Sequence, residues 1–119
     1  MNLAQMIKAI RSNLSDKVRE KFFRGDPNPE TGCCYVASEA LYHLTGRKLQ
    51  PMRIEVRHPK YGCVGHWYLQ DTSNGTVHDI TASQFPFPLD YSQGHKRAFL
   101  TKEPCKRTKT LLEAIQDAI

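Results

Sequence analysis

A thiol, an imidazole and a carboxylate follow one another along this chain in an order that suits nucleophilic catalysis. They belong to Cys34, His66 and Asp79. A thiolate can attack an acyl carbon, an imidazole can carry the proton to the leaving group, and a carboxylate can fix the ring and stabilise the imidazolium. We therefore interpret these three residues as a candidate catalytic triad.

Cys34 lies where a loop should pass into a helix. The loop contains two prolines and ends at Gly32, and the segment from Cys34 to Leu44 has the apolar pattern of a buried helix. A helix N-terminus favours a thiolate, although free cysteines are also commonly buried as small apolar residues. Cys33 is the competing nucleophile and would point about 100° away around the helix. The Cys34 N–H is a candidate oxyanion donor, and the Asn28 side chain is a weaker one.

His66 and Asp79 fall on two predicted strands, joined by a turn with an Asn-Gly pair at 74–75 that is typical of hairpins. Opposed residues of a hairpin share a face. A four-residue loop at 72–75 would put Asp79 opposite Tyr68 and diagonal to His66. A five-residue loop would put the two side chains on opposite faces unless a bulge intervened. The sequence permits the triad geometry without requiring it.

The order of the helices and strands that must position these residues predicts an α+β fold in a single domain, 1–119. The hydrophobic content of 39% and charged content of 24% are ordinary for a globular protein. The expected elements are two N-terminal helices within 1–24 (3–14 and 15–23), a catalytic-like core at 33–100 with a helix at 33–44 and strands at 52–56, 65–70 and 76–80, a candidate short strand at 98–100, and a C-terminal helix within 104–119.

Four residues are candidates for substrate binding: Asn28, Trp67, Phe85 and Tyr91. The Pro- and aromatic-rich stretch that holds Phe85 and Tyr91 has two interpretations. It can cover the sheet as part of the core, or it can form an apolar wall beside the nucleophile that selects substrate.

The order and spacing of these motifs resemble the transglutaminase-like branch of the papain-like cysteine enzymes. The matching pieces are Cys34-Tyr35, His66-Trp67 and Asp79-Ile80-Thr81, with Ile80 where relatives commonly have proline. The resemblance implies a central cysteine-bearing helix packed on a small antiparallel sheet. It also implies a thiol-dependent hydrolase or acyltransferase, such as a protease or amidase, that forms a thioester. Residues 31–107 further resemble small bacteriophage and prophage proteins, which would make a host or phage protein the substrate.

Two other interpretations remain open. Cys63 and His66 have ligand-like spacing, and zinc binding would need further ligands from a set of other residues. That set is Cys33, Cys34, His58, His78 and Cys105. A non-catalytic protein that binds and modulates a host factor is the second alternative.

Charge and hydropathy restrict the partners. The net charge of +5 is mildly basic without a nucleic-acid-binding motif, so nucleic acid stays a partner without support from the sequence. No apolar run reaches the length of a membrane span, and the N-terminus has the pattern of an amphipathic helix. We expect a cytoplasmic protein, in the bacterial host if it is phage-encoded, with free cysteines, a peptide-like or amide substrate, no membrane partner, no metal and no cofactor.

Overall fold

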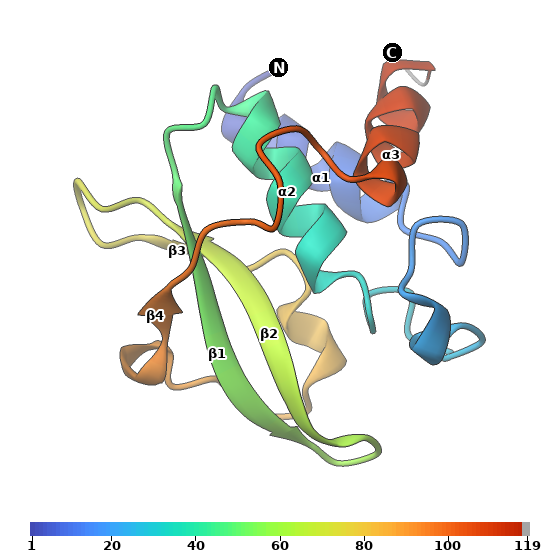
Figure 1. Cartoon of the computed structure of the whole chain (residues 1–119), viewed down its shortest axis with the longest axis vertical. Helices are drawn as coiled ribbons and strands as arrows, with labels where there is room; N and C mark the ends of the chain where they lie inside the picture. Colours follow the sequence, from blue (N-terminus) through green and yellow to red (C-terminus); the bar gives the residue numbers. More distant parts are fainter. Residues whose placement is uncertain (118–119) are drawn as a thin grey trace.

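A long antiparallel hairpin forms the centre of the structure, a computed structural model that describes residues 1–117 (Figure 1). It consists of β1 (Gln50–His58) and β2 (Gly62–Gln70), in a register that sets Ile54 opposite His66. Two short strands extend the sheet, β3 (Val77–His78) beside β2 and β4 (His95–Lys96) beside β1. The sheet order is β3-β2-β1-β4, and all pairings are antiparallel.

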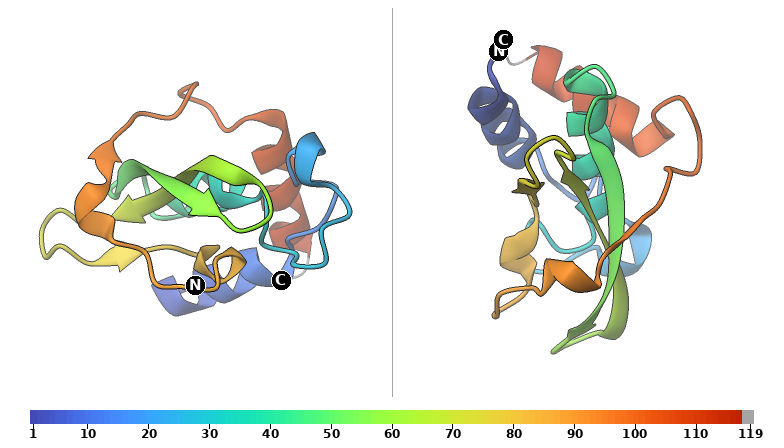
Figure 2. Two further views of the ribbon diagram at one scale, coloured as in Figure 1. Left: turned by 90° about the horizontal axis from the view of Figure 1, so that it is seen from below. Right: turned by 90° about the vertical axis from the view of Figure 1, so that its left-hand side faces the viewer.

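Three helices pack together, and the second of them packs on one face of this sheet. They are α1 (Leu3–Ser12), α2 (Cys34–Leu44) and α3 (Lys106–Asp117), and the views of Figure 2 show α1 and α3 beside α2. Their buried side chains form one apolar cluster with Leu69 and Ile80. The cluster also contains Ile10, Val36, Ala37, Ala40, Leu41, Leu111 and Ile115. The α+β class predicted from the sequence is therefore confirmed.

The opposite face of the sheet has an apolar cluster of its own. Met52, Ile54, Val56 and Tyr68 project from β1 and β2, and Phe85 from the following segment covers them. The Pro- and aromatic-rich stretch thus returns across this face with two 3-10 turns, Ala82–Gln84 and Tyr91–Gln93. This part of its predicted role, as cover for the sheet, is confirmed.

The prediction of a second N-terminal helix is wrong. Only one turn forms after Ser15, whose carbonyl accepts hydrogen bonds from Val18 and Arg19. The next amide, that of Glu20, instead donates to the carbonyl of Gly32 at 3.2 Å. This long-range bond draws the chain toward the loop before α2, so the segment ends in the short 3-10 turn Lys21–Phe23.

The short strand lies a few residues earlier than expected. Residues 98–100 form no strand, and it is His95–Lys96 that pairs with Met52 and Arg53 of β1. The strand predicted at 76–80 is limited to Val77–His78. The C-terminal helix was predicted within 104–119, of which 118–119 lie outside the described residues.

The loop between β2 and β3 takes the four-residue form, one of the two lengths that the sequence left open. The Asp71 N–H donates to the Thr76 carbonyl at 2.8 Å, and Leu69 pairs with His78. Continuing this register by one residue places Asp79 opposite Tyr68, as the four-residue loop requires.

Candidate active site

Cys34 is the first residue of α2, and the loop that delivers it is held by a buried arginine. Arg19 is 2% exposed. Its guanidinium donates to the carbonyls of Phe23, Asp26 and Asn28 at 3.2, 3.0 and 2.8 Å. Three carbonyls around one fixed cation define the path of a loop that has little regular structure. The N–H groups of the first helical turn have no intrahelical acceptors, so they remain available near the thiol.

His66 and Asp79 form a buried pair on one face of the sheet. The His66 Nε2 lies 2.7 Å from the Asp79 Oδ2, and the His66 side chain is 1% exposed. The same carboxylate oxygen accepts a hydrogen bond from the Tyr91 hydroxyl at 2.7 Å. On its other side the ring meets Gln84, whose Nε2 is 3.3 Å from Nδ1. The same Gln84 nitrogen donates to the Thr81 carbonyl at 3.2 Å, so it can donate to Nδ1 only when the ring is neutral.

The contacts of His66 favour its charged form. Burial acts to lower the pKa of the imidazole, but the hydrogen bond to Asp79 and the nearby Cys34 side chain outweigh it and raise the pKa to about 9. Phe85 packs edge-on against the ring at a centroid distance of 5.0 Å, which limits access of water from that side. An imidazolium beside a thiol favours the thiolate, and this is the arrangement that nucleophilic attack needs.

The body of α2 and the His66–Asp79 pair lie on opposite faces of the sheet. Cys34 contacts the sheet at the edge of β2. This edge is open near Gly65 because β3 is too short to cover it there. The Cys34 Sγ lies 4.0 Å from the Gly65 carbonyl oxygen there. The N-terminus of α2 thus reaches the residue that precedes His66.

The two adjacent cysteines differ in exposure. Cys33 is completely buried, and burial raises the pKa of its thiol to about 11. Its Sγ lies 3.5 Å from the Pro29 carbonyl oxygen. Cys34 is half-buried and lines a cavity. This difference favours Cys34 as the nucleophile of the pair.

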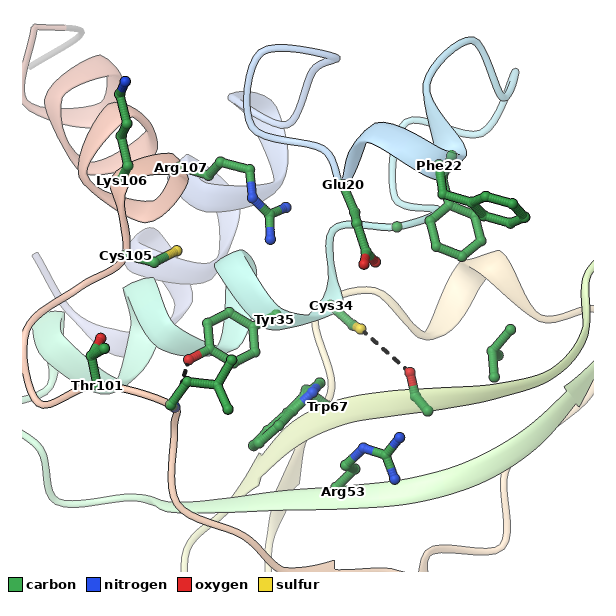
Figure 3. A pocket seen from close by; sticks show the side chains of 15 residues that line it. Glu20, Phe22, Cys34, Tyr35, Arg53, Trp67, Thr101, Cys105, Lys106 and Arg107 are labelled. Carbon is green, nitrogen blue, oxygen red and sulfur yellow. Dashed lines mark hydrogen bonds between the residues drawn. The ribbon is translucent and has the colours of Figure 1, made fainter.

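The cavity beside Cys34 has a volume of about 740 Å³ and a largely aromatic wall (Figure 3). Tyr35 meets Trp67 edge to face at 5.1 Å, and Trp67 stacks on Phe99 at 5.4 Å. Of the three triad residues, Cys34 alone lines this cavity. The cavity therefore meets the triad at the Cys34 sulfur.

The four predicted substrate-binding residues take different places. Trp67 lines the cavity. Phe85 is buried against the His66 ring, and Tyr91 donates its hydroxyl to Asp79. The Asn28 side chain is engaged in the loop, where its amide donates to the Ser83 carbonyl at 3.1 Å and its oxygen accepts from the Glu30 N–H at 2.9 Å. None of these last three lines the cavity.

Several residues at the site were not found by sequence reasoning. Gln84 contacts the second nitrogen of His66, and Arg53 and Arg107 line the cavity. No local pattern marks Gln84, and Arg107 comes from α3, far from Cys34 in sequence. The alternation of β1 does place Arg53 opposite Trp67, and this register was the one signal that could have indicated it.

Two negative findings concern residues 1–117. No group of three or more His, Cys, Asp or Glu side chains in that part of the chain is arranged to hold a metal ion. None of the described helices has the length and apolar character needed to cross a membrane.

Comparisons with known protein families, with curated proteins and with solved structures found no significant match.

Proposed function

We propose that the chain is a thiol-dependent hydrolase or acyltransferase that acts on a protein or peptide-like amide through Cys34, His66 and Asp79. The observation that carries this proposal is the buried 2.7 Å pair of His66 Nε2 and Asp79 Oδ2 next to the thiol at the start of α2. Burial of two ionisable groups costs free energy unless they are paired, so a fully buried pair beside a half-buried thiol suits a chemical role.

The reaction would proceed in two balanced steps. The Cys34 thiolate attacks the acyl carbon, and the tetrahedral oxyanion is stabilised by backbone N–H groups at the start of α2. The His66 imidazolium then donates its proton to the leaving amine as the C–N bond breaks, leaving a thioester. In the second step neutral His66 takes a proton from water or an acceptor amine, which attacks the thioester and releases the Cys34 thiolate. Asp79 holds the ring throughout.

The papain-like or transglutaminase-like fold belongs to the same proposal. A cysteine that opens the helix α2, a histidine on β2 and an aspartate just after β3 follow the order of that superfamily. The α2 helix also packs on a small antiparallel sheet. These features support the assignment through chain order and architecture.

Alkylation kinetics provide the test. In a Cys63→Ser background, which removes the exposed thiol, iodoacetamide should label Cys34 at neutral pH at least tenfold faster than it labels a free cysteine, by order of magnitude. Intact-mass spectrometry would follow the reaction. Cys33→Ala is the matched control for Cys34→Ala and should keep the fast phase that Cys34→Ala abolishes.

The triad variants complete this experiment. His66→Gln and Asp79→Asn should both slow the labelling of Cys34, since each weakens the imidazolium beside the thiol. Labelling of Cys34 at the rate of a free cysteine, or at an unchanged rate in His66→Gln, would contradict the proposal.

A further inference from the structure

We propose that the cavity beside Cys34 selects an acyl donor in which a carboxylate lies next to an apolar side chain. This inference rests on the proposed function and adds the substrate class. The cavity has three cationic side chains and one carboxylate in its lining: Arg53, Lys106, Arg107 and Glu20. The excess of positive charge lies in a pocket walled largely by aromatic side chains, where charge interactions are stronger than in bulk water.

Arg107 presents its guanidinium to the cavity from α3 (Figure 3). It is half-buried, and one nitrogen donates to the Val18 carbonyl at 3.0 Å. Within residues 1–117 no carboxylate lies within salt-bridge distance of it. The bond to Val18 fixes the side chain while its remaining N–H donors stay available, and a guanidinium with free donors suits a carboxylate.

Arg53 supplies a second guanidinium from β1, close to the nucleophile. It lies flat over Gly65, where a Cβ atom would overlap the guanidinium. The carbonyl of that same glycine contacts the Cys34 Sγ at 4.0 Å. One nitrogen of Arg53 pairs with Glu55. In Figure 3 Trp67 lies between Arg53 and Arg107, so both arginines flank an aromatic surface next to the sulfur.

The lining also holds one carboxylate. Glu20 lies between Arg107 and Phe22, with its carboxylate directed toward the Cys34 side of the cavity, and Lys106 lies farther away (Figure 3). Like charges repel, so Glu20 disfavours an anionic substrate group in its own surroundings, whereas the three cations of the lining favour one elsewhere in the cavity.

Apolar contacts are available at both ends of the cavity. Phe22 is 75% exposed and Leu100 is 78% exposed, and both belong to its lining. Both side chains can therefore contact an apolar group of a ligand bound in the cavity. Together with the arginines they define a peptide-like ligand with apolar groups and a carboxylate near the acyl carbon.

A matched pair of probes tests this inference. The acyloxymethyl ketones Ac-Phe-Glu and Ac-Phe-Gln have nearly the same shape and differ in charge. In the Cys63→Ser background, intact-mass kinetics should give faster labelling of Cys34 by the Glu probe, by roughly fivefold, the size expected for a partly exposed charge pair. The ratio should decrease as salt is added.

Three glutamine variants assign the preference to residues. Arg107→Gln and Arg53→Gln should each lower the Glu/Gln rate ratio toward one, whereas Arg47→Gln, which lies outside this cavity, should keep it. The rate with the neutral Gln probe checks that each variant is folded. Equal labelling by both probes in the parent protein, or a ratio that survives in both cavity variants, would overturn this inference alone. Labelling of Cys34 by neither probe would overturn the proposed function with it.

Discussion

The imidazole of His66 is almost inaccessible to water, yet its contacts keep it charged. Asp79 contacts Nε2 of the ring, and Tyr91 donates a second hydrogen bond to the Asp79 oxygen that faces it. Asp79 and Tyr91 influence each other, since burial and the neighbouring carboxylate raise the pKa of the Tyr91 phenol. Tyr91 therefore stays a donor over the whole physiological range and helps to keep Asp79 in place.

This charge state makes the stability of the fold depend on pH. The pKa of His66 is raised from 6.5 to about 9, so the folded chain keeps a proton that the unfolded chain releases above pH 6.5. The resulting stabilisation is fully present below pH 6.5 and is lost as the pH rises through 9. The free energy of unfolding should fall over this window by on the order of a few kcal/mol.

Urea unfolding of the parent protein and of His66→Gln between pH 6 and 10 measures this effect. The variant should lack the decrease that His66 causes, while titration of the groups that do not contact His66 affects both proteins alike. Parallel curves for the two proteins would contradict the raised pKa.

At the scale of elements, the turn before α2 determines where the thiol lies. Gly32 has φ +77°, a left-handed conformation that favours glycine, and its carbonyl accepts the bond from the Glu20 amide. A Cβ atom at residue 32 would lie 2.6 Å from the Cβ of Phe23. Position 32 therefore requires glycine for two independent reasons, the left-handed backbone and the close approach of Phe23.

Gly75 provides a matched control for these two effects. It also has φ +77°, but a Cβ atom there would meet nothing within 4 Å. Gly75→Ala should therefore cost about 1 kcal/mol from backbone strain alone. Gly32→Ala should cost a further 1–3 kcal/mol, by order of magnitude, from the overlap with Phe23, and should slow iodoacetamide labelling of Cys34. Equal losses in urea unfolding would show that the overlap is relieved without cost.

Local patterns at this scale predicted the helices and strands that keep their own hydrogen bonds. The alternation of Met52, Ile54 and Val56 predicted β1, and the Asn-Gly pair predicted the turn after β2. The helix expected after Ser15 failed because the Glu20 amide finds its acceptor in Gly32, a residue that local propensity does not consider.

At the scale of the whole molecule, the sheet separates two apolar clusters, and α3 completes the cavity from outside the sheet. A buried carboxylate joins α3 to the centre. Glu39 on α2 is completely buried, and its Oε1 accepts the Cys105 N–H at 2.8 Å immediately before α3 begins. This bond connects the helix that bears Cys34 to the helix that bears Arg107.

Removal of this bond should lower both the free energy of unfolding and the preference of the cavity for the Glu probe. Glu39→Ala leaves the Cys105 N–H without its acceptor and should lower the free energy of unfolding by about 2–3 kcal/mol. It should also reduce the Glu/Gln probe ratio, because α3 carries Arg107. Glu39→Gln keeps an acceptor oxygen and should lose less on both measures. Equal loss in the two variants would contradict a role for this hydrogen bond.

The sequence by itself determined the α+β class and the helix start at Cys34, and it permitted the four-residue turn that lets His66 and Asp79 share a face. These features depend on hydrophobic period, glycine and turn chemistry, which act over a few residues. The tertiary structure alone decided the surroundings of the triad. It buried Cys33 completely and left Cys34 half-buried beside the cavity, brought Gln84 to the imidazole and Tyr91 to the carboxylate, and placed Arg107 in the cavity. Such contacts join segments far apart in the chain, and they form only when the two faces of the sheet are covered by packing.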